Sequence, residues 1–231
     1  MIQNNERYKR QLPLLGAESA EILSKKSVMI CGLGGVGGYV LEALVRVGIG
    51  RIIAIDGDVF EASNLNRQLL CTAANIGESK AKAALERAKA INPDIDISAE
   101  ILYLDSKNIP KLIQKYKPDY IADATDDVNA KLCLAEEAQK RGIPSISCMG
   151  TGNMLKSNVF ECADIYSTSV CPLAKTMRRL LKERGVEKLK AVYSKETPSV
   201  RGSEISSVSF VPAAAGLLMA EEIIKDLLLI S

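Results

Sequence analysis

Apolar residues in the first 150 positions fall alternately into short runs and into longer stretches with helical spacing. The short runs are typical of buried strands, and the longer stretches, in which apolar positions recur every three or four residues, predict helices. The predicted strands cover residues 27–31, 51–55, 95–101, 119–124 and 146–149, and the predicted helices cover 36–47, 79–91, 108–116 and 127–140. Strands that alternate with helices at this spacing favour a parallel sheet with helices on both faces.

The pattern changes after about residue 155, where strands follow one another with fewer helices between them. Strands are predicted at 155–160, 189–193 and 206–210, and helices at 172–184 and 212–228. We therefore expect an α/β fold whose doubly wound, mostly parallel sheet is continued by antiparallel strands.

No linker divides the chain, so residues 1–231 are interpreted as a single nucleotide-binding domain. It has an N-terminal arm over 1–25 and a substrate-side elaboration over 155–231 that ends in the last helix. That helix either completes the core, joins a subunit interface, or does both.

Composition narrows the class of protein. The chain is 47% hydrophobic and 25% charged, which excludes wholesale disorder. It has no histidine, which excludes histidine-ligated metal sites, Ser-His-Asp and Cys-His triads and a histidine general base. Its six cysteines form no Cys-x-x-Cys pair, so no structural zinc is expected. Without an apolar signal core or a membrane-length run, we expect a cytoplasmic protein with reduced thiols.

A glycine-rich motif directly follows the first predicted strand and opens a helix. Gly32, Gly34 and Gly37 match G-x-G-x-x-G, with Gly35 between them, and Asp56 follows 19 residues after the last glycine. The glycines let the backbone approach phosphates, the helix start supplies free N–H groups, and the aspartate can accept from ribose hydroxyls. The motif indicates a Rossmann-like nucleotide site and suggests NAD by itself. The alternative is a glycine turn with a packing role only.

Further polar residues favour a nucleoside triphosphate over NAD. Arg67 can bind phosphate oxygens as a fork, and Lys80 adds a second positive charge at a helix start. The acidic end of the fourth strand suits Mg²⁺ bridged to phosphates. Each residue alone has a structural alternative, which is a surface arginine for Arg67, a solvated helix residue for Lys80 and the N-cap of the following helix for Asp126. However, all of them fall at carboxyl ends of strands, where ligands bind in doubly wound sheets. The members of this cluster are Ser63, Asn64, Asn66, Arg67, Lys80, Asp126 and Asp127.

Six motifs together resemble a known superfamily. RYKRQ, GLGGVG, IDGD, SNLNRQ, GESK and DATD, in this order over residues 6–127, resemble the E1-like (HesA/MoeB/ThiF) superfamily of ATP-dependent carboxylate adenylyltransferases. The resemblance implies that Gly35 contacts the nucleotide, Asp56 holds the ribose and Lys80 binds phosphate. It also implies that Asp126 holds Mg²⁺ and that the phosphates are faced by Ser63, Asn64, Asn66 and Arg67.

The same resemblance implies catalytic roles for Arg67, Lys80, Asp126 and Arg10. The arginine of the N-terminal arm would reach into the site of a partner subunit, so a homodimer is expected. A carboxylate would attack the α-phosphate of ATP, giving an acyl-adenylate and pyrophosphate. Such chemistry needs positioning and charge neutralisation but no histidine.

The second half resembles a narrower family. ADIYSTSVCPLAK, MRRLLKERG, VYSKE and VSFVP resemble the tRNA threonylcarbamoyladenosine dehydratases. Members of that family activate the threonyl carboxylate of the modified adenosine at position 37 of a tRNA and close it to a cyclic form. This implies a tRNA substrate.

Two other functions are weighed against this one. The first is an adenylyltransferase for the C-terminal carboxylate of a sulfur-carrier or ubiquitin-like protein of the molybdopterin or thiamin type. The lack of zinc-binding cysteine pairs counts against it, whereas the RYKRQ arm resembles it more, and a sulfur-relay partner is left open. The second is a non-catalytic NAD module, which the Asn/Arg cluster, Lys80 and the acidic strand end disfavour.

Charge distribution points independently to RNA. Residues 171–195 contain eight lysines and arginines against two glutamates, a net charge of +6, whereas the whole chain carries +2. A cationic stripe on a near-neutral body is typical of a surface that binds phosphate backbone, and a solvated helix face is the alternative. Cys171, within this segment, invites a thioester interpretation, but we expect a small buried apolar residue. The eight cations are Lys175, Arg178, Arg179, Lys182, Arg184, Lys188, Lys190 and Lys195.

Overall fold

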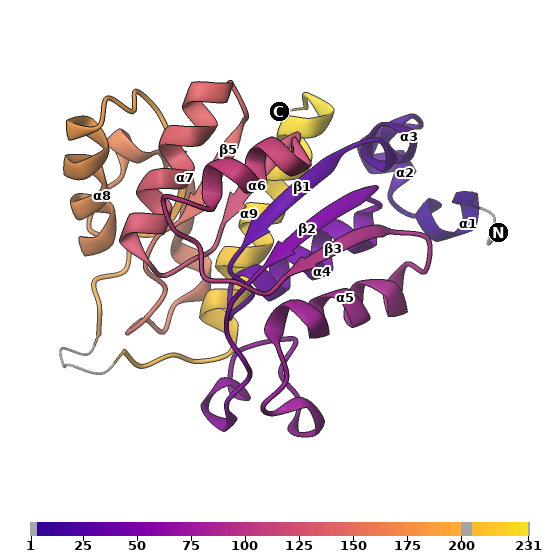
Figure 1. Ribbon diagram of the computed structural model, residues 1–231, viewed down its shortest axis with the longest axis horizontal. Coiled ribbons are helices and arrows are strands. Elements are labelled where there is room, and N and C mark those ends of the chain that lie inside the picture. Colours follow the sequence, from indigo (N-terminus) through magenta and orange to yellow (C-terminus); the bar gives the residue numbers. More distant parts are fainter. Residues whose placement is uncertain (1–3, 200–204, 231) are drawn as a thin grey trace.

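The computed structural model describes residues 4–199 and 205–230 and contains a seven-stranded sheet of order β3-β2-β1-β4-β5-β7-β6 (Figure 1). Neighbouring strands are parallel except β6 and β7, which pair antiparallel. The expected fold class is confirmed. The strands are β1 (Ser27–Cys31), β2 (Arg51–Ile55), β3 (Asp96–Glu100), β4 (Tyr120–Asp123), β5 (Ser145–Cys148), β6 (Phe160–Asp164) and β7 (Lys190–Ser194).

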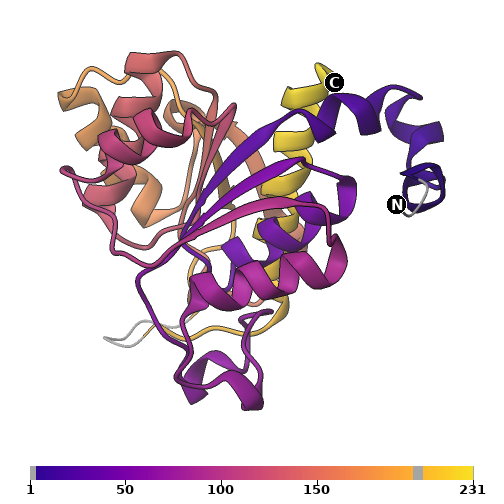
Figure 2. The same ribbon diagram turned by 45° about the vertical axis from the view of Figure 1, so that its right-hand side comes forward.

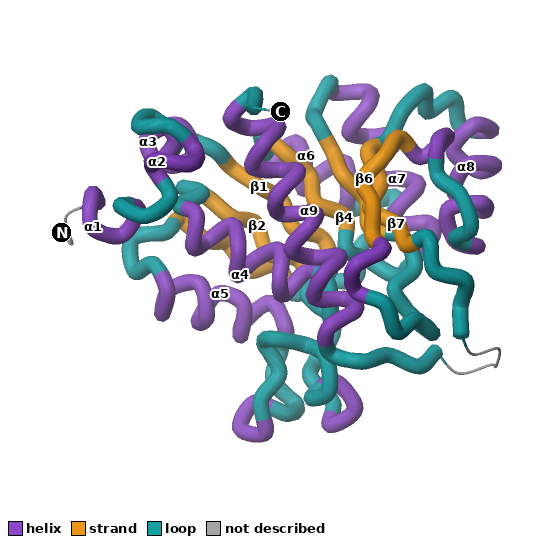
Figure 3. The backbone as a smooth tube through the Cα atoms, turned by 180° about the vertical axis from the view of Figure 1, so that it is seen from behind, coloured by secondary structure: helices purple, strands orange, loops and turns teal. Residues whose placement is uncertain are grey.

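Helices cover both faces of the sheet because the strand side chains are apolar on both sides. Val28 and Ile30 of β1 pack in one core cluster with α4 and α9, while Met29 and Cys31 pack in a second cluster with α6 and α7. Figure 3 shows α4, α5 and α9 across the near face. Helix α8 packs with α7 and β7 in a third cluster. The helices are α4 (Gly37–Val47), α5 (Lys80–Ile91), α6 (Ile109–Tyr116), α7 (Val128–Arg141), α8 (Pro172–Glu183) and α9 (Phe210–Leu228).

The N-terminal arm packs at the end of the sheet where the strands begin. Tyr8 is buried against Gly48 at the C-terminus of α4, where a Cβ would lie 2.8 Å from the tyrosine ring. The Gln11 amide donates to the backbone oxygen of Val47 at 2.9 Å. Helices that connect parallel strands run antiparallel to them, so the arm lies opposite the carboxyl ends of the strands. Its helices are α1 (Asn4–Tyr8), α2 (Leu12–Leu15) and α3 (Ser19–Ser24).

The last helix, α9, completes the core. Gly216 crosses α4 so closely that a Cβ there would lie 2.5 Å from the backbone oxygen of Val36. Asp226 accepts hydrogen bonds from Tyr120 at 2.6 Å and from Lys190 at 2.7 Å, which fixes the helix to the start of β4 and β7. In the part of the chain that the structure describes, neither α9 nor any other helix has the length and apolarity to cross a bilayer.

Two of the predicted strands are wrong. Residues 155–159 hold a loop and the 3₁₀-helix η3 (Ser157–Val159), and the strand begins only at Phe160. The amides of Leu155 and Lys156 donate to the Glu196 carboxylate instead of to a strand. The strand expected at 206–210 is absent. The described residues 205–209 are irregular, and α9 already begins at Phe210. Pro212 then falls in the first turn of the helix, where its missing N–H costs nothing.

Candidate functional site

The glycine motif forms the tight turn between β1 and α4. Gly32 has φ of +85°, and a Cβ there would lie 2.7 Å from the backbone oxygen of Ala124. A Cβ at Gly37 would lie 1.8 Å from the oxygen of Gly32. Neither position can hold a side chain. Gly34 differs, since the nearest atom to a Cβ there is the Gln68 amide nitrogen at 3.7 Å. The turn is therefore sterically open at Gly34, where a ligand group can approach the backbone.

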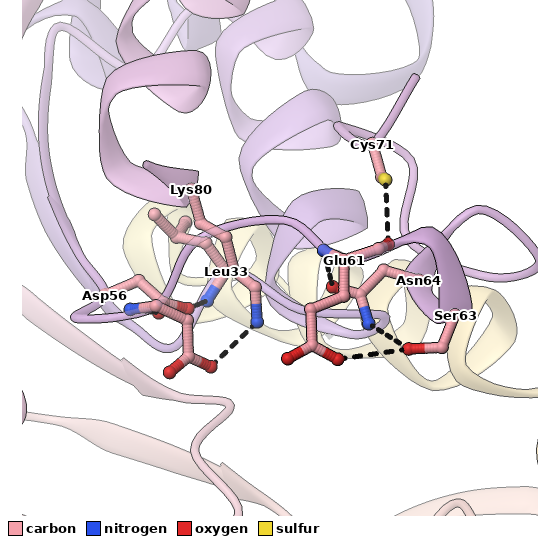
Figure 4. Close-up of polar contacts among 8 residues, drawn as sticks. Leu33, Asp56, Glu61, Ser63, Asn64, Cys71 and Lys80 are labelled. Atoms are coloured by element: carbon pink, nitrogen blue, oxygen red, sulfur yellow. Dashed lines mark hydrogen bonds and ion pairs between the residues drawn. The ribbon is translucent and has the colours of Figure 1, made fainter. Parts of the chain in front are cut away.

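Asp56 lies beside this turn at the end of β2. Its carboxylate accepts from the amide of Leu33 at 2.7 Å and from the amide of Asp58 at 2.8 Å (Figure 4). Burial raises the pKa of Asp56, although these amide donors and the charge of Lys80 oppose the increase. Each oxygen keeps a further lone pair, so the geometry leaves acceptors for ribose hydroxyls.

Lys80 is buried at the first position of α5, after the N-cap Ser79. Its ammonium lies 2.8 Å from the carboxylate of Asp58, two residues after Asp56. Burial works against the charged form of Asp58, but the interactions with Lys80 and Tyr103 lower the pKa of its carboxyl group. The structure thus places a desolvated cation close to Asp56, at the carboxyl end of β2.

Arg67 lies over the Gly35 end of the turn. A Cβ at Gly35 would be 3.5 Å from the Arg67 side chain. The guanidinium donates to the backbone oxygen of Ser63 and to the side chain of Asn66, both at 2.9 Å. Asn64 is buried and accepts from the Glu61 amide at 3.1 Å, so it caps the 3₁₀-helix η1 (Ala62–Asn64). The segment therefore combines a half-buried guanidinium fork with residues that hold its loop.

The two aspartates after β4 have different surroundings. Asp127 is the N-cap of α7, since its carboxylate accepts from the amide of Ala130 at 2.7 Å. Asp126 is exposed, and its carboxylate has no hydrogen-bond partner within residues 4–199 and 205–230. Their turn packs against Gly32 through Ala124. The N-cap of α7 is therefore Asp127 and not Asp126.

Arg10 is not brought to the site of its own chain. It is exposed and lies within the arm, which packs at the C-terminal ends of α4 and α5, whereas the site lies at their N-terminal ends. Figure 2 shows the N-terminal helices far from the loops that follow β2. Any contact of Arg10 with a nucleotide would therefore have to come from another copy of the chain.

The basic segment carries less free charge than its sequence suggests. Four of its eight cations form ion pairs, among them Lys190 with Asp226 at 2.7 Å and Lys195 with Glu161 at 2.6 Å. Arg178 donates to the backbone oxygen of Thr168 at 3.0 Å. The exposed face of α8 nonetheless presents Lys175 and Lys182, together with Arg179, which pairs with Glu183 on the same helix at 2.7 Å.

Cys171 is 1% exposed and packs in the apolar cluster of α8 with Met149 and Met177. A buried thiol at the N-cap of a helix has no access for a macromolecular acyl group. The location agrees with the interpretation of this cysteine as a small core residue.

Two residues near the site were missed in the sequence. Gln68 is 7% exposed, and its side-chain oxygen has no hydrogen-bond partner among the described residues, while its nitrogen faces Gly34. It follows Arg67 directly in SNLNRQ, which was the available signal. Lys131 is 1% exposed, and its place between the apolar helix positions Ala130 and Leu134 was the signal for burial.

The site fits ATP on these observations. An open glycine turn, a buried lysine and an arginine fork supply donors for phosphates, and Asp56 supplies acceptors for a ribose. Gln68, with its orphaned amide, faces the same turn. For a metal ion the donor set is smaller, because no group of three or more His, Cys, Asp or Glu side chains suited to a metal occurs among residues 4–199 and 205–230.

Comparison with known proteins gives matches over most of the chain. The model of the ThiF family matches residues 8–230. A tRNA threonylcarbamoyladenosine dehydratase of Bacillus subtilis is 33% identical over 240 aligned positions, which cover 96% of this chain and 94% of that protein. A sulfur carrier protein adenylyltransferase of Thermus thermophilus is 37% identical over 143 positions, 61% of this chain and 52% of that protein.

A solved structure extends the match to three dimensions. The crystal structure of the Escherichia coli tRNA N6-threonylcarbamoyladenosine dehydratase, TcdA, in complex with ATP aligns with a TM-score of 0.91. It is 26% identical, and the alignment covers 97% of this chain and 95% of that chain. The resemblance seen in the sequence motifs is confirmed.

Substitution of Gly34 tests whether the turn receives a ligand group. Gly34→Ala fits the free protein, since the nearest atom is 3.7 Å away, but its methyl group would occupy the space for a phosphate. We expect a thermal midpoint close to that of the unaltered protein and ATP affinity reduced by about tenfold or more, a loss of roughly 1.4 kcal/mol. Calorimetric titration with ATP and thermal unfolding check this.

The matched variant is Gly37→Ala, whose Cβ would lie 1.8 Å from the Gly32 oxygen and which should therefore destabilise the fold itself. Unchanged ATP affinity in Gly34→Ala would place the phosphates elsewhere.

Proposed function

We propose that this chain, which belongs to the ThiF family, is an ATP-dependent tRNA threonylcarbamoyladenosine dehydratase that cyclises the threonylcarbamoyl group of adenosine 37. The observation that carries the proposal is the match to the Bacillus subtilis dehydratase, which runs through nearly all of both chains. The likeness in fold to the ATP complex of the Escherichia coli dehydratase supports ATP as the cosubstrate. The grouping of Asp56, Arg67 and Lys80 around the open turn supports the same nucleotide.

The first step joins two anions, and the site residues lower its barrier by neutralising charge. A carboxylate oxygen of the substrate attacks the α-phosphorus of ATP, and the bond to the pyrophosphate oxygen breaks. Asp56 orients the ribose, while Arg67 and Lys80 stabilise negative charge on the phosphates. Fixed charges held by the fold need no reorganisation during the reaction, which is why positioning and electrostatics suffice.

In the second step the ring closes and AMP leaves. A nucleophile within the same threonylcarbamoyl group attacks the activated carbonyl carbon, loses its proton, and expels AMP with the former carboxylate oxygen. Both ends are already tethered, so closure is intramolecular and fast. The net change is loss of water from the substrate, coupled to conversion of ATP to AMP and pyrophosphate. No covalent bond to the protein is needed, which agrees with the burial of Cys171.

Asp126 is the residue that would hold Mg²⁺. Its exposed carboxylate stands at the carboxyl end of β4, next to the turn that receives the phosphates. Mg²⁺ commonly binds through one or two carboxylates together with substrate phosphates and waters, so a single aspartate fits this metal. When bound, the ion would neutralise phosphate charge, and the chain's own part is to hold the carboxylate in place. Asp127 serves α7 as a cap and contributes to this region through the helix start.

Arg10 completes the site from a partner subunit in a homodimer. Its distance from the site of its own chain, at the far ends of α4 and α5, supports action across an interface. Most soluble oligomers are symmetric dimers in which each chain contributes the same surface to the other. Each of two sites would then contain one arginine from the opposite arm.

A sulfur-carrier adenylyltransferase is the second candidate, and the 37% identity to the Thermus thermophilus enzyme favours it. That match covers 61% of this chain, whereas the match to the Bacillus subtilis dehydratase covers 96%. The acyl-adenylate step would be the same for both, so the substrate that supplies the carboxylate distinguishes them. A sulfur-relay partner is a prediction that belongs with this second candidate.

Pyrophosphate release from ATP separates the candidates. We expect release to be stimulated by tRNA that carries threonylcarbamoyladenosine, because its carboxylate is the nucleophile, and not by unmodified tRNA or by a carrier protein with a free C-terminus. Mass spectrometry of the recovered nucleoside should show the loss of one water. Stimulation by the carrier protein alone would contradict the dehydratase assignment.

Mixed dimers test the role of Arg10. Arg10→Ala and Asp126→Ala should each lower turnover by about 10²–10³-fold, since each removes charge from the same reacting phosphates. After the two inactive variants are mixed and allowed to exchange subunits, about a quarter of normal turnover should return. This follows because half of randomly paired symmetric dimers are mixed and each mixed dimer holds one intact site.

Lys9→Ala is the control in the same arm, since Lys9 is exposed and pairs with Glu6 there. Recovery should be absent when either variant is mixed with itself. Mixed dimers without any recovery would show that the arginine does not act across the interface.

The exposed face of α8 is the surface that would bind the tRNA backbone. Lys175 and Lys182 stand seven residues apart on the same helix face, with Arg179 between them. Lys190 and Lys195 belong to the same basic segment but are engaged by acidic side chains. The lysines of α8 are therefore better placed to bind phosphates.

Charge reversal tests this surface. The double variant Lys175→Glu/Lys182→Glu should weaken tRNA binding by about tenfold or more at moderate salt and flatten its dependence on salt concentration, because fewer counterions are released on binding. ATP binding should stay the same, since the ATP site lies on other elements. The control is Lys195→Glu in the same segment. Equal tRNA affinity of the double variant and the unaltered protein would exclude this face.

A further inference from the structure

A charged pair lies buried directly behind the acidic turn and takes no part in the contacts described so far. Lys131 of α7 is 1% exposed and Asp123 at the end of β4 is 3% exposed, and the ammonium and carboxylate are 3.1 Å apart. Removal of two charges from water costs so much that a buried ion pair is often no more stabilising than well-packed apolar side chains. Stability alone therefore does not account for this pair.

The lysine is fully satisfied by the ends of two strands. Its ammonium also donates to the backbone oxygen of Cys148 at 2.7 Å and to the hydroxyl of Ser147 at 3.3 Å. Ser147 in turn donates to the same oxygen of Asp123 at 2.6 Å. An ammonium has three donors, and each finds an acceptor here. The cluster thus joins α7 to the carboxyl ends of β4 and β5.

The other oxygen of Asp123 holds the turn that carries Asp126. It accepts from the backbone N–H of Thr125 at 3.1 Å and from the Thr125 hydroxyl at 2.8 Å. On the other side of Asp126, the carboxylate of Asp127 caps α7. The backbone N–H of Ala124 donates to Cys31 at the end of β1, at 2.8 Å. Hydrogen bonds therefore hold the turn on both sides of Asp126, while the Asp126 side chain itself is exposed.

We infer that Lys131 and Asp123 are positioning residues that act through Thr125 to fix Asp126 for the phosphates of ATP and their Mg²⁺. This inference rests on the proposed function. A carboxylate that binds a metal needs a fixed orientation, and loss of the outer partners that orient such ligands commonly costs about 10–100-fold in metal affinity or activity. The buried pair touches no substrate, and its charge strengthens both hydrogen bonds from Thr125, because an ionised acceptor binds more strongly than a neutral one.

Thr125→Val tests the link between the pair and Asp126. The substitution keeps the volume of the side chain but removes its hydroxyl donor to Asp123. We expect the Mg²⁺ concentration for half-maximal ATP binding to rise by about tenfold or more. In the free protein, amide hydrogen exchange over residues 124–127 should become faster.

The matched control is Thr168→Val, which removes another buried threonine hydroxyl, bonded to the Ile165 oxygen at 2.6 Å. It should change neither the Mg²⁺ dependence nor the exchange of residues 124–127. If Thr125→Val equals this control in both measurements, the positioning role is excluded.

The double variant Lys131→Met/Asp123→Asn tests the pair itself and avoids an unpaired buried charge. The asparagine side chain would keep an acceptor for Thr125 and gain a donor toward Ser147, so the chain is expected to fold, which thermal unfolding checks. The Mg²⁺ requirement and the exchange of residues 124–127 should shift in the same direction as in Thr125→Val, because the remaining acceptor is neutral. Values equal to those of the unaltered protein would overturn the inference.

The metal role of Asp126 and the positioning role of the buried pair can be tested separately. If the unaltered protein binds ATP without any dependence on Mg²⁺, both the metal role of Asp126 and the inference are contradicted. If it shows that dependence and both sets of variants retain it, only the positioning role fails. Hydrogen exchange, which needs neither ATP nor Mg²⁺, reports on the turn in either case.

Discussion

Close backbone contact between two turns is the constraint on which the site depends. A Cβ on Gly32 would clash with the Ala124 oxygen at 2.7 Å, and a Cβ on Gly37 would clash with the Gly32 oxygen at 1.8 Å. Only glycine allows β1 to pass into α4 while the turn after β4 stays against it. This contact brings the phosphate-facing turn and the Asp126 turn, which are about 90 residues apart in sequence, to one edge of the sheet. Without this contact, the charged side chains of the two turns would not face the same ligand.

The charges at this edge are balanced differently on its two sides. On the side of β2, Lys80 is buried and has Asp58 as its partner, while Arg67 is satisfied by a backbone oxygen and Asn66. On the side of β4, the inner carboxylate of Asp123 is neutralised by Lys131, and Asp126 is exposed. Positive groups thus face the open turn from one side and an exposed carboxylate from the other. A triphosphate with a divalent cation complements both, which links the electrostatics to the activation of a carboxylate.

The sequence predicted the first half of the fold closely because its elements are strongly patterned and bounded by glycines. The strands at 27–31 and 51–55 agree with the structure in every residue, and the helix predicted over 79–91 is observed as α5 from Lys80, with Ser79 as its N-cap. Predictions failed where tertiary contacts decide the backbone. The amides at 155 and 156 bind Glu196, some 40 residues away, and the residues before α9 are irregular although their apolar content resembles a strand. Local pattern carries no information on such distant partners.

The residues of the candidate site also fall into those that could be predicted from the sequence and those that could not. The turn, Asp56, Arg67 and Lys80 could be predicted because their motifs place them at strand ends, which any doubly wound sheet brings together. The pairing of Lys131 with Asp123 and the orphaned side-chain oxygen of Gln68 could not, since both depend on how separate segments pack together. Net charge over 171–195 also overstated the free positive surface, because Arg184 and Lys190 find acids on α7 and α9.

The most direct test of the account is a crystal structure of the protein with ATP and Mg²⁺. The account predicts the ribose at Asp56, the phosphates between the Gly34 turn, Arg67 and Lys80, and the metal ion at Asp126. A nucleotide bound away from the carboxyl ends of the strands, or one that these side chains do not contact, would contradict it.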